Sequence, residues 1–266
     1  MNRQQLIDQI KIKKSYLCVG LDTSMEKIPA HLMSHKNALF EFNRQIIDAT
    51  KDLCVGYKIN TAFYEAEGVE GWEAMEQTVN YISSSHFKIA DAKRGDIGNT
   101  SAQYAKAFFE KLNFDAITVA PYMGADSIQP FLDYENKWTI VLGLTSNKGS
   151  EDFEQLEIEG KYVYETIIKK VSEWGNKDNL MFVVGATKAT ELSSIRKIVP
   201  DNFLLIPGVG AQGGSLEEVS RHGLNKDYGL LVNASRAIIY AGNGENFAEE
   251  ARAVAMQYQK EMMSYL

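Results

Sequence analysis

Short apolar segments rich in β-branched and aromatic residues alternate with longer amphipathic segments along the whole chain. Eight such apolar segments occur, at Tyr16–Leu21, Cys54–Asn60, Phe87–Ala90, Ala116–Ala120, Trp138–Leu144, Leu180–Gly185, Phe203–Ile206 and Gly229–Asn233. They are mostly continuous runs rather than strict alternations of apolar and polar residues, which is typical of parallel strands that are covered by helices. The pattern therefore predicts eight parallel strands.

The segments between these runs repeat apolar residues at helical spacing. In Asn37–Asp52, for example, Leu39, Phe42 and Ile46 fall on one face of a helix. Helices are also expected at Arg3–Lys14, Val69–Ser84, Thr100–Leu112, Lys161–Trp174, Lys188–Val199, Ser215–His222 and Phe247–Tyr265. The first of these precedes the first strand and is expected to be an extra N-terminal helix.

Strand–helix alternation repeated eight times favours an α/β fold with a closed (β/α)8 TIM barrel. The alternative is a doubly wound open sheet. A barrel needs about 250 residues, and the chain has 266, with no linker or Pro/Gly/Ser-rich break between two halves. We therefore expect a single barrel domain over residues 1–266, with the extra helix at its N-terminus.

Charge and composition exclude several classes of protein. The chain has 28 basic and 35 acidic residues, a net charge of −7, which argues against a general nucleic-acid binder or a polybasic membrane-surface protein. The first residues lack the apolar core of a signal peptide, and no apolar run approaches the ~20 residues of a membrane span. Cys18 and Cys54 lie in apolar runs and are expected to be buried thiols. We expect a cytoplasmic protein.

The end of the third strand carries the densest charge, in the sequence DAKRGDIGNT. Active sites of barrels lie at the carboxyl ends of the strands. Asp91 and Lys93 are two residues apart, so on a strand both side chains face the same way. Gly95 permits a sharp turn that would carry Asp96 toward a neighbouring site. The structural alternative is a salt-bridged pair, with Asp96 capping a helix that begins near Ile97.

Two further charges lie at the ends of the first and second strands. Lys58 occurs within CVGYKIN, where a solvated lysine is unexpected, and Asp22 follows the first strand. Together with Asp91 and Lys93 they would form an alternating array of charge around the barrel mouth. Such charges are costly to bury unless they are paired, so the array indicates either a reaction centre or a structural ion-pair network.

The end of the seventh strand reads PGVGAQGG and matches GxGxxG at Gly208, Gly210 and Gly213. A dinucleotide site would need an acidic residue ~20 positions later, and that region, LLVNAS, has none. Barrels often bind phosphate after strands seven and eight, at the start of a short extra helix. Backbone amides of this loop, the Gln212 amide and the Arg236 guanidinium would then hold a phosphate. The alternative is a glycine-rich surface loop.

The motif DAKRGDIGNT, with Asp22 and Lys58 before it and PGVGAQGG and SRAIIYA after it, resembles the orotidine 5′-phosphate decarboxylase family. The resemblance extends from LCVGLD to RAIIYA and is strongest to the longer bacterial branch, type 2. It implies a homodimer of (β/α)8 barrels that converts orotidylate to uridylate and CO2, the last step of de novo UMP synthesis. It also implies that no cofactor and no metal take part.

The resemblance also implies roles for individual residues. Its catalytic set is Lys58, Asp91, Lys93 and Asp96, with Lys93 as the proton donor to C6 of the pyrimidine. Its substrate-binding set is Asp22, Thr100, Ser146, Pro207, Gly208, Gln212, Gly213, Ser235 and Arg236. Asp96 and Thr100 would complete the site of the partner subunit.

The segment between Ser146 and Lys161 contains the acidic run EDFEQLEIEG and is specific to the longer branch. We name residues 146–161 the insert, and its role stays open. Ser146 rather than Thr145 is assigned the contact with the pyrimidine.

Two other functions fit a charged barrel mouth. A magnesium-dependent sugar-phosphate decarboxylase or aldolase of the same barrel superfamily would use the carboxylates to hold a metal that stabilises an enediolate, and EDTA would inhibit it. A catalytically silent nucleotide-binding barrel is the second. The Lys58 array and the GAQGG loop favour orotidylate over the first, and the costly cluster of Asp91, Lys93 and Asp96 argues against the second.

Overall fold

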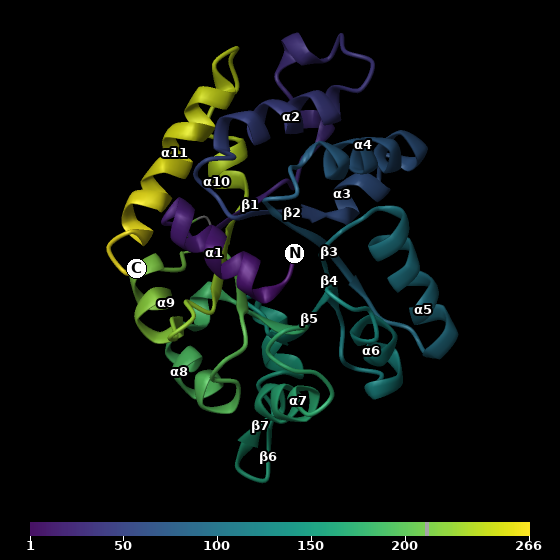
Figure 1. Ribbon diagram of the computed structural model, residues 1–266, viewed down its shortest axis with the longest axis vertical. Helices are drawn as coiled ribbons and strands as arrows, with labels where there is room; N and C mark the ends of the chain where they lie inside the picture. The colour runs from purple at the N-terminus through teal and green to yellow at the C-terminus, as the bar shows by residue number, and fades with distance from the viewer. Residues whose placement is uncertain (211–212) are drawn as a thin grey trace.

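A computed structural model describes residues 1–210 and 213–266, and eight parallel strands close into a barrel at its centre (Figure 1). The strands are β1 (Leu17–Gly20), β2 (Gly56–Asn60), β3 (Phe87–Arg94), β4 (Ala116–Val119), β5 (Trp138–Leu144), β8 (Leu180–Val184), β9 (Leu204–Pro207) and β10 (Leu230–Ala234). Their order around the barrel is β1-β10-β9-β8-β5-β4-β3-β2. The predicted TIM barrel is thus confirmed, and each strand falls where an apolar run predicted it.

Helices surround the barrel (Figure 1). They are α1 (Arg3–Lys13), α2 (Ala38–Thr50), α3 (Thr61–Glu65), α4 (Gly68–Tyr81), α5 (Gly98–Lys106), α6 (Ala125–Leu132), α7 (Val163–Ser172), α8 (Ala189–Ile198), α9 (Leu216–Gly223), α10 (Arg236–Ile239) and α11 (Phe247–Met262). In α2, Leu39, Phe42 and Ile46 are buried on one face, and the Asn37 side chain caps its first turn. No helix within the described residues is long and apolar enough to cross a membrane.

Two helices were not predicted, and several predicted bounds were wrong. The missed helices α3 and α6 have five and eight residues, too few to show a clear period, and α6 contains Pro130. The helix expected from Thr100 begins at Gly98, and after α5 the backbone continues in π-helical form over Ala107–Lys111. The helix expected from Lys161 begins at Val163.

The later start of α7 has a structural cause in the insert. Strands β6 (Glu157–Ile158) and β7 (Lys161–Tyr162) form an antiparallel hairpin outside the barrel. Lys161 and Tyr162 therefore pair with β6 instead of opening the helix. After β5 the chain therefore forms a small hairpin, separate from the barrel sheet, before it enters α7.

Helix α1 lies across the amino end of the barrel (Figure 1), where aromatic side chains pack together. The Trp138 ring packs edge-on against Phe87 and Phe203, with centroid distances of 6.1 and 6.3 Å, and its indole N–H donates to the Met1 carbonyl at 2.9 Å. The Arg3 guanidinium donates to backbone carbonyls that precede β8 and β9. The predicted extra helix therefore seals this end, and the opposite end is left for a site.

Candidate active site

A pocket of about 290 Å³ lies at the carboxyl ends of the barrel strands. Nine of the residues assigned to the site from the sequence line it: Asp22, Lys58, Asp91, Lys93, Ser146, Pro207, Gly208, Ser235 and Arg236. They come from the ends of six different strands or the loops after them. The barrel thus brings together charges and loops that are more than 200 residues apart in the chain.

The expected alternation of charge is present at the pocket floor. The Lys58 ammonium lies 2.8 Å from the Asp91 carboxylate and 3.5 Å from that of Asp22. The Lys93 ammonium lies 2.6 Å from the other oxygen of Asp91. The side chain of Lys58 is 4% exposed, whereas that of Lys93 is 50% exposed. Lys93 is therefore the cation of the array that a ligand in the pocket could meet.

The array keeps its buried members charged. Burial by itself lowers the pKa of Lys58, but the attraction of Asp91 and Asp22 outweighs it and holds that pKa above its ordinary value. Burial raises the pKa of Asp91, but Lys58 and Lys93 outweigh it and hold that pKa well below the usual range. Near neutral pH Lys58 and Asp91 are thus both held in their charged forms.

The backbone at the end of β3 departs from the expected geometry. The strand runs to Arg94 rather than ending at Ala90, and its pairing with β4 shifts register between those two residues. Lys93 takes a left-handed conformation with φ of 47°, which costs a non-glycine residue about 1–2 kcal/mol. The simple two-residue alternation that placed Lys93 beside Asp91 therefore does not describe this segment.

Thr118 on β4 supports this unusual backbone. Its buried hydroxyl accepts the N–H of Lys93 at 2.9 Å and donates to the Asp91 carboxylate at 3.0 Å. One side chain thus fixes both the strained peptide and the neighbouring acid. Sequence reasoning missed Thr118, although it is the polar residue inside the apolar run AITVA, directly across from a charged strand end.

Asp96 and Thr100 do not line the pocket of their own chain. After the strand, Gly98 takes a left-handed conformation with φ of 41° and opens α5. The Asp96 carboxylate accepts the N–H of Ile97 at 2.8 Å, and Ile97 rather than Asp96 occupies the N-cap position of α5. Thr100 is exposed in the first turn of that helix.

The glycine-rich loop after β9 requires its glycines for backbone reasons. Gly208, Gly210 and Gly213 have φ of 95°, 75° and 85°, values that side chains disfavour. The amides of Gly210, Gly213 and Gly214 donate to carbonyls within the loop, so these three are not among the free amides that a phosphate-binding loop was expected to offer. Gly213 does not line the pocket, and Gln212 lies outside the described residues.

The expected short helix after the eighth strand is α10, which begins at Arg236. Before it, the Ser235 hydroxyl lies against Gly20, where an added Cβ would be 1.8 Å from it. The Asn233 amide donates to that hydroxyl at 3.2 Å. Asn233 is buried and lines the pocket, and the sequence analysis did not assign it to the site. Its Oδ1 has no hydrogen-bond partner in the part of the chain that the structure describes.

Two of the predicted strand-end segments do not line the pocket, although Val183 near the end of β8 does. Neither Pro121–Tyr122 after β4 nor Thr187–Lys188 after β8 lines it, and Tyr122 is 95% exposed. Cys18 and Cys54 are buried free thiols, as expected, and burial raises the pKa of the Cys54 thiol to about 11. Over residues 1–210 and 213–266, no group of three or more His, Cys, Asp or Glu side chains could hold a metal ion.

A closed parallel barrel with charged strand ends around one pocket defines the TIM-barrel class of enzymes. Residues 15–251 match the family model described as orotidine 5′-phosphate decarboxylase / HUMPS family. A protein of Flavobacterium johnsoniae named orotidine 5′-phosphate decarboxylase is 60% identical over 265 residues, which are 98% of this chain and 97% of that protein. The chain belongs to this family.

Solved structures show the same fold. A structure from Toxoplasma gondii titled putative orotidine-monophosphate-decarboxylase is 34% identical, with a TM-score of 0.87, and the match covers 98% of each chain. The structure of Leishmania donovani UMP synthase is 37% identical, with a TM-score of 0.84 over 96% of this chain. This chain spans 56% of the length of that synthase chain.

Proposed function

We propose that this chain decarboxylates orotidine 5′-monophosphate to UMP and CO2, the last step of de novo UMP synthesis, without a cofactor. The observation that carries the proposal is the array of Asp22, Lys58, Asp91 and Lys93 on the pocket floor. Support also comes from the named decarboxylase that is 60% identical over nearly the whole chain.

The reaction leaves a pair of electrons on C6 of the pyrimidine, with no cofactor to accept them. Asp91, held ionised, would lie beside the carboxylate of the substrate. Two such charges ~4 Å apart repel by about 4 kcal/mol at an effective dielectric constant of 20. Departure of CO2 relieves that repulsion. The Asp91 carboxylate therefore favours loss of CO2 over retention of the bound acid.

Lys93 is proposed to stabilise the developing carbanion and then to donate a proton from its ammonium to C6. Its half-exposed side chain and its contact with Asp91 at 2.6 Å support this role. Lys58, which is buried between Asp22 and Asp91, would hold the carboxylates in place. The proton lost by Lys93 is the one that appears on C6 of UMP.

The other end of the pocket is proposed to bind the phosphate. Arg236 and Ser235 would bind it together with Pro207, Gly208 and, from the same loop, Gln212 and Gly213. Binding energy from this remote group can be used to order the site and exclude water. Asp22 is also proposed to bind the substrate.

Ser146 is proposed to contact the pyrimidine. Both Thr145 and Ser146 line the pocket, but the Thr145 hydroxyl lies within 3.0 Å of the carboxylate of Glu154. That engagement supports the choice of Ser146.

We also propose a homodimer in which Asp96 and Thr100 reach the partner's pocket. Their position outside their own pocket and the exposure of neighbouring apolar side chains, 58% for Ile97 and 95% for Tyr122, support it. Mixing Lys93→Ala with Asp96→Asn subunits should rebuild one intact site in each mixed dimer, restoring about a quarter of wild-type activity after random exchange. If the mixture stays as inactive as its parts, Asp96 does not act across the interface.

The test of the function is the ultraviolet absorbance of orotidylate after addition of the purified protein, with and without EDTA. The proposal expects loss of the substrate absorbance at equal rates in both. Activity that EDTA abolishes would favour the magnesium-dependent alternative.

A further inference from the structure

Glu154, in the insert, is tied to the pocket wall at the end of β5. Its carboxylate accepts the backbone N–H of Thr145 at 2.7 Å. The Thr145 hydroxyl lies 2.9 and 3.0 Å from the two carboxylate oxygens. Thr145 lines the pocket and directly precedes Ser146. One side chain of the insert therefore fixes the peptide that leads into Ser146.

Glu154 is itself held by the protein. Its carbonyl accepts the N–H of Tyr164, a buried residue of α7, at 2.9 Å. The next residue, Gln155, donates to the Ser150 hydroxyl at 2.7 Å and accepts from the Lys188 ammonium at 3.1 Å. The carboxylate thus extends from a segment that is bonded to α7, to the start of the insert and to the loop after β8.

The opposite side of Ser146 is confined by Gly185 at the end of β8. A Cβ added to Gly185 would lie 2.8 Å from the Ser146 nitrogen and 2.9 Å from its Cα. The Gly185 N–H donates to the Leu144 carbonyl at 2.8 Å. The backbone of Ser146 therefore packs directly on one strand end, while the preceding residue is held by Glu154.

We propose that Glu154 is a positioning residue that holds the Thr145–Ser146 segment against the pyrimidine of the substrate. This inference rests on the proposed decarboxylation and on Ser146 as the pyrimidine contact. It assigns a role to the insert, which supplies Glu154 from outside the barrel. Residues of this kind keep a binding group in its productive geometry, and a displacement of ~1 Å can cost about 100-fold in rate.

The chemistry of the contact sets which substitutions should matter. Glutamine keeps an oxygen that can accept from both donors of Thr145, although without charge. Aspartate keeps the charge but is one methylene shorter and does not reach. Alanine removes the acceptor. The inference therefore ranks glutamine as the mildest change at Glu154, and aspartate and alanine as the severe ones.

The experiment compares Glu154→Ala, Glu154→Asp and Glu154→Gln with Glu157→Ala, which removes an exposed acid from β6 of the same insert. Steady-state kinetics with orotidylate and calorimetric affinities for UMP and ribose 5-phosphate are measured for each. We expect the alanine and aspartate variants to lose about 10- to 100-fold in kcat/KM and in UMP affinity, with ribose 5-phosphate affinity retained. Glutamine should stay within about fivefold of wild type, and Glu157→Ala should be unchanged.

Unchanged kcat/KM in Glu154→Ala would overturn the inference, as would equal losses for UMP and ribose 5-phosphate or a glutamine variant as impaired as alanine. A wild-type protein that does not consume orotidylate would instead overturn the proposed function. If Glu154→Ala does not fold, Thr145→Val removes only the hydroxyl donor. A several-fold loss of UMP affinity in that variant supports the inference, and wild-type affinity contradicts it.

Discussion

The two ends of the barrel each hold a lysine, Lys58 buried and Lys13 half-buried, and the two lysines differ in what surrounds them. At the carboxyl end Lys58 lies between Asp91 and Asp22, whose attraction outweighs burial and raises its pKa. At the amino end the Lys13 ammonium donates to the carbonyls of Lys51 and Cys54, each at 2.7 Å. Burial lowers the pKa of Lys13. One site concentrates full charges, whereas the other ties a charge to backbone dipoles.

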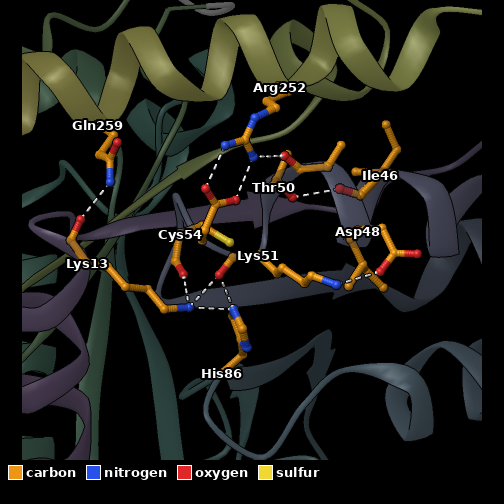
Figure 2. Close-up of polar contacts among 12 residues, drawn as sticks. Lys13, Ile46, Asp48, Thr50, Lys51, Cys54, His86, Arg252 and Gln259 are labelled. Atoms are coloured by element: carbon orange, nitrogen blue, oxygen red, sulfur yellow. Dashed lines mark hydrogen bonds and ion pairs between the residues drawn. The ribbon is translucent and has the colours of Figure 1, made fainter.

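Figure 2 shows how the amino-end lysine is used. Beside Lys13, at 2.5 Å from its ammonium, lies the Nε2 atom of His86, and the Gln259 amide of α11 donates to the Lys13 carbonyl at 2.7 Å. These contacts join the end of α1 to α11 and to the segments before β2 and β3. The comparison teaches that a half-buried cation can hold chain segments together through their backbone carbonyls, whereas Lys58, between two carboxylates, belongs to the proposed reactive site.

The largest effect is expected from removal of the proposed proton donor. Lys93→Ala should lower kcat by about 10³- to 10⁴-fold, since general acid catalysis contributes up to about 10⁴-fold and the cation also stabilises the carbanion. UMP should still bind. Steady-state kinetics and calorimetry with UMP measure the two quantities, and a variant with a substantial residual rate contradicts the role of Lys93.

A matched pair of variants tests whether the two lysines differ in their roles. Lys58→Met leaves Asp22 and Asp91 without their buried partner, and should cost about 3–5 kcal/mol of stability together with most of the activity. Lys13→Met removes the donor to the carbonyls of Lys51 and Cys54 and should cost about 1–3 kcal/mol of stability with unchanged kinetics. Denaturant unfolding and kcat/KM are measured for both. Loss of activity in Lys13→Met with its stability intact would show that the two ends are not separate in role.

Protonation of His86 at the amino end of the barrel should lower the free energy of unfolding in acid. Burial, and then the charge of Lys13, lowers the pKa of His86 to about 4 from its ordinary value of 6.5. The folded protein therefore binds this proton less readily than the unfolded chain, so the stabilisation is complete above pH 6.5 and falls as the pH drops toward 4. The loss is on the order of 3 kcal/mol.

His86→Gln can still accept from Lys13 and does not titrate, so its unfolding free energy should vary less between pH 6.5 and 4 than that of wild type. Asp91 also loses stabilisation in acid, but only at lower pH, because its folded-state pKa lies well below the ordinary value. An unchanged slope in His86→Gln over this window would remove His86 from the acid response.

The smallest effect is expected at the phosphate end of the pocket. Arg236→Ala should weaken orotidylate binding by about 10- to 100-fold, the value of a hydrogen bond to a charged group, because Arg236 is exposed and the base end stays intact. Competition by ribose 5-phosphate should weaken in parallel. Unchanged affinity for both would remove Arg236 from the phosphate site.

The sequence predicted the barrel because apolar runs and helical periods repeat along it, and strand ends in a barrel converge whatever their separation in the chain. That rule was enough to bring Asp22, Lys58 and Asp91 together. It could not predict the left-handed backbone of Lys93, because that depends on the Thr118 hydroxyl across the β3–β4 pair. The link from Glu154 to Thr145 likewise exists only once the insert has folded back.

The measurement that most directly tests the reactive role of the carboxyl end is the decay of orotidylate absorbance in EDTA, for wild type and Lys93→Ala side by side. Rapid decay with the wild-type protein, unaffected by the chelator, and no enzymatic decay with the variant are expected. Decay that requires a metal, or that persists in the variant, would contradict a cofactor-free decarboxylation centred on Lys93.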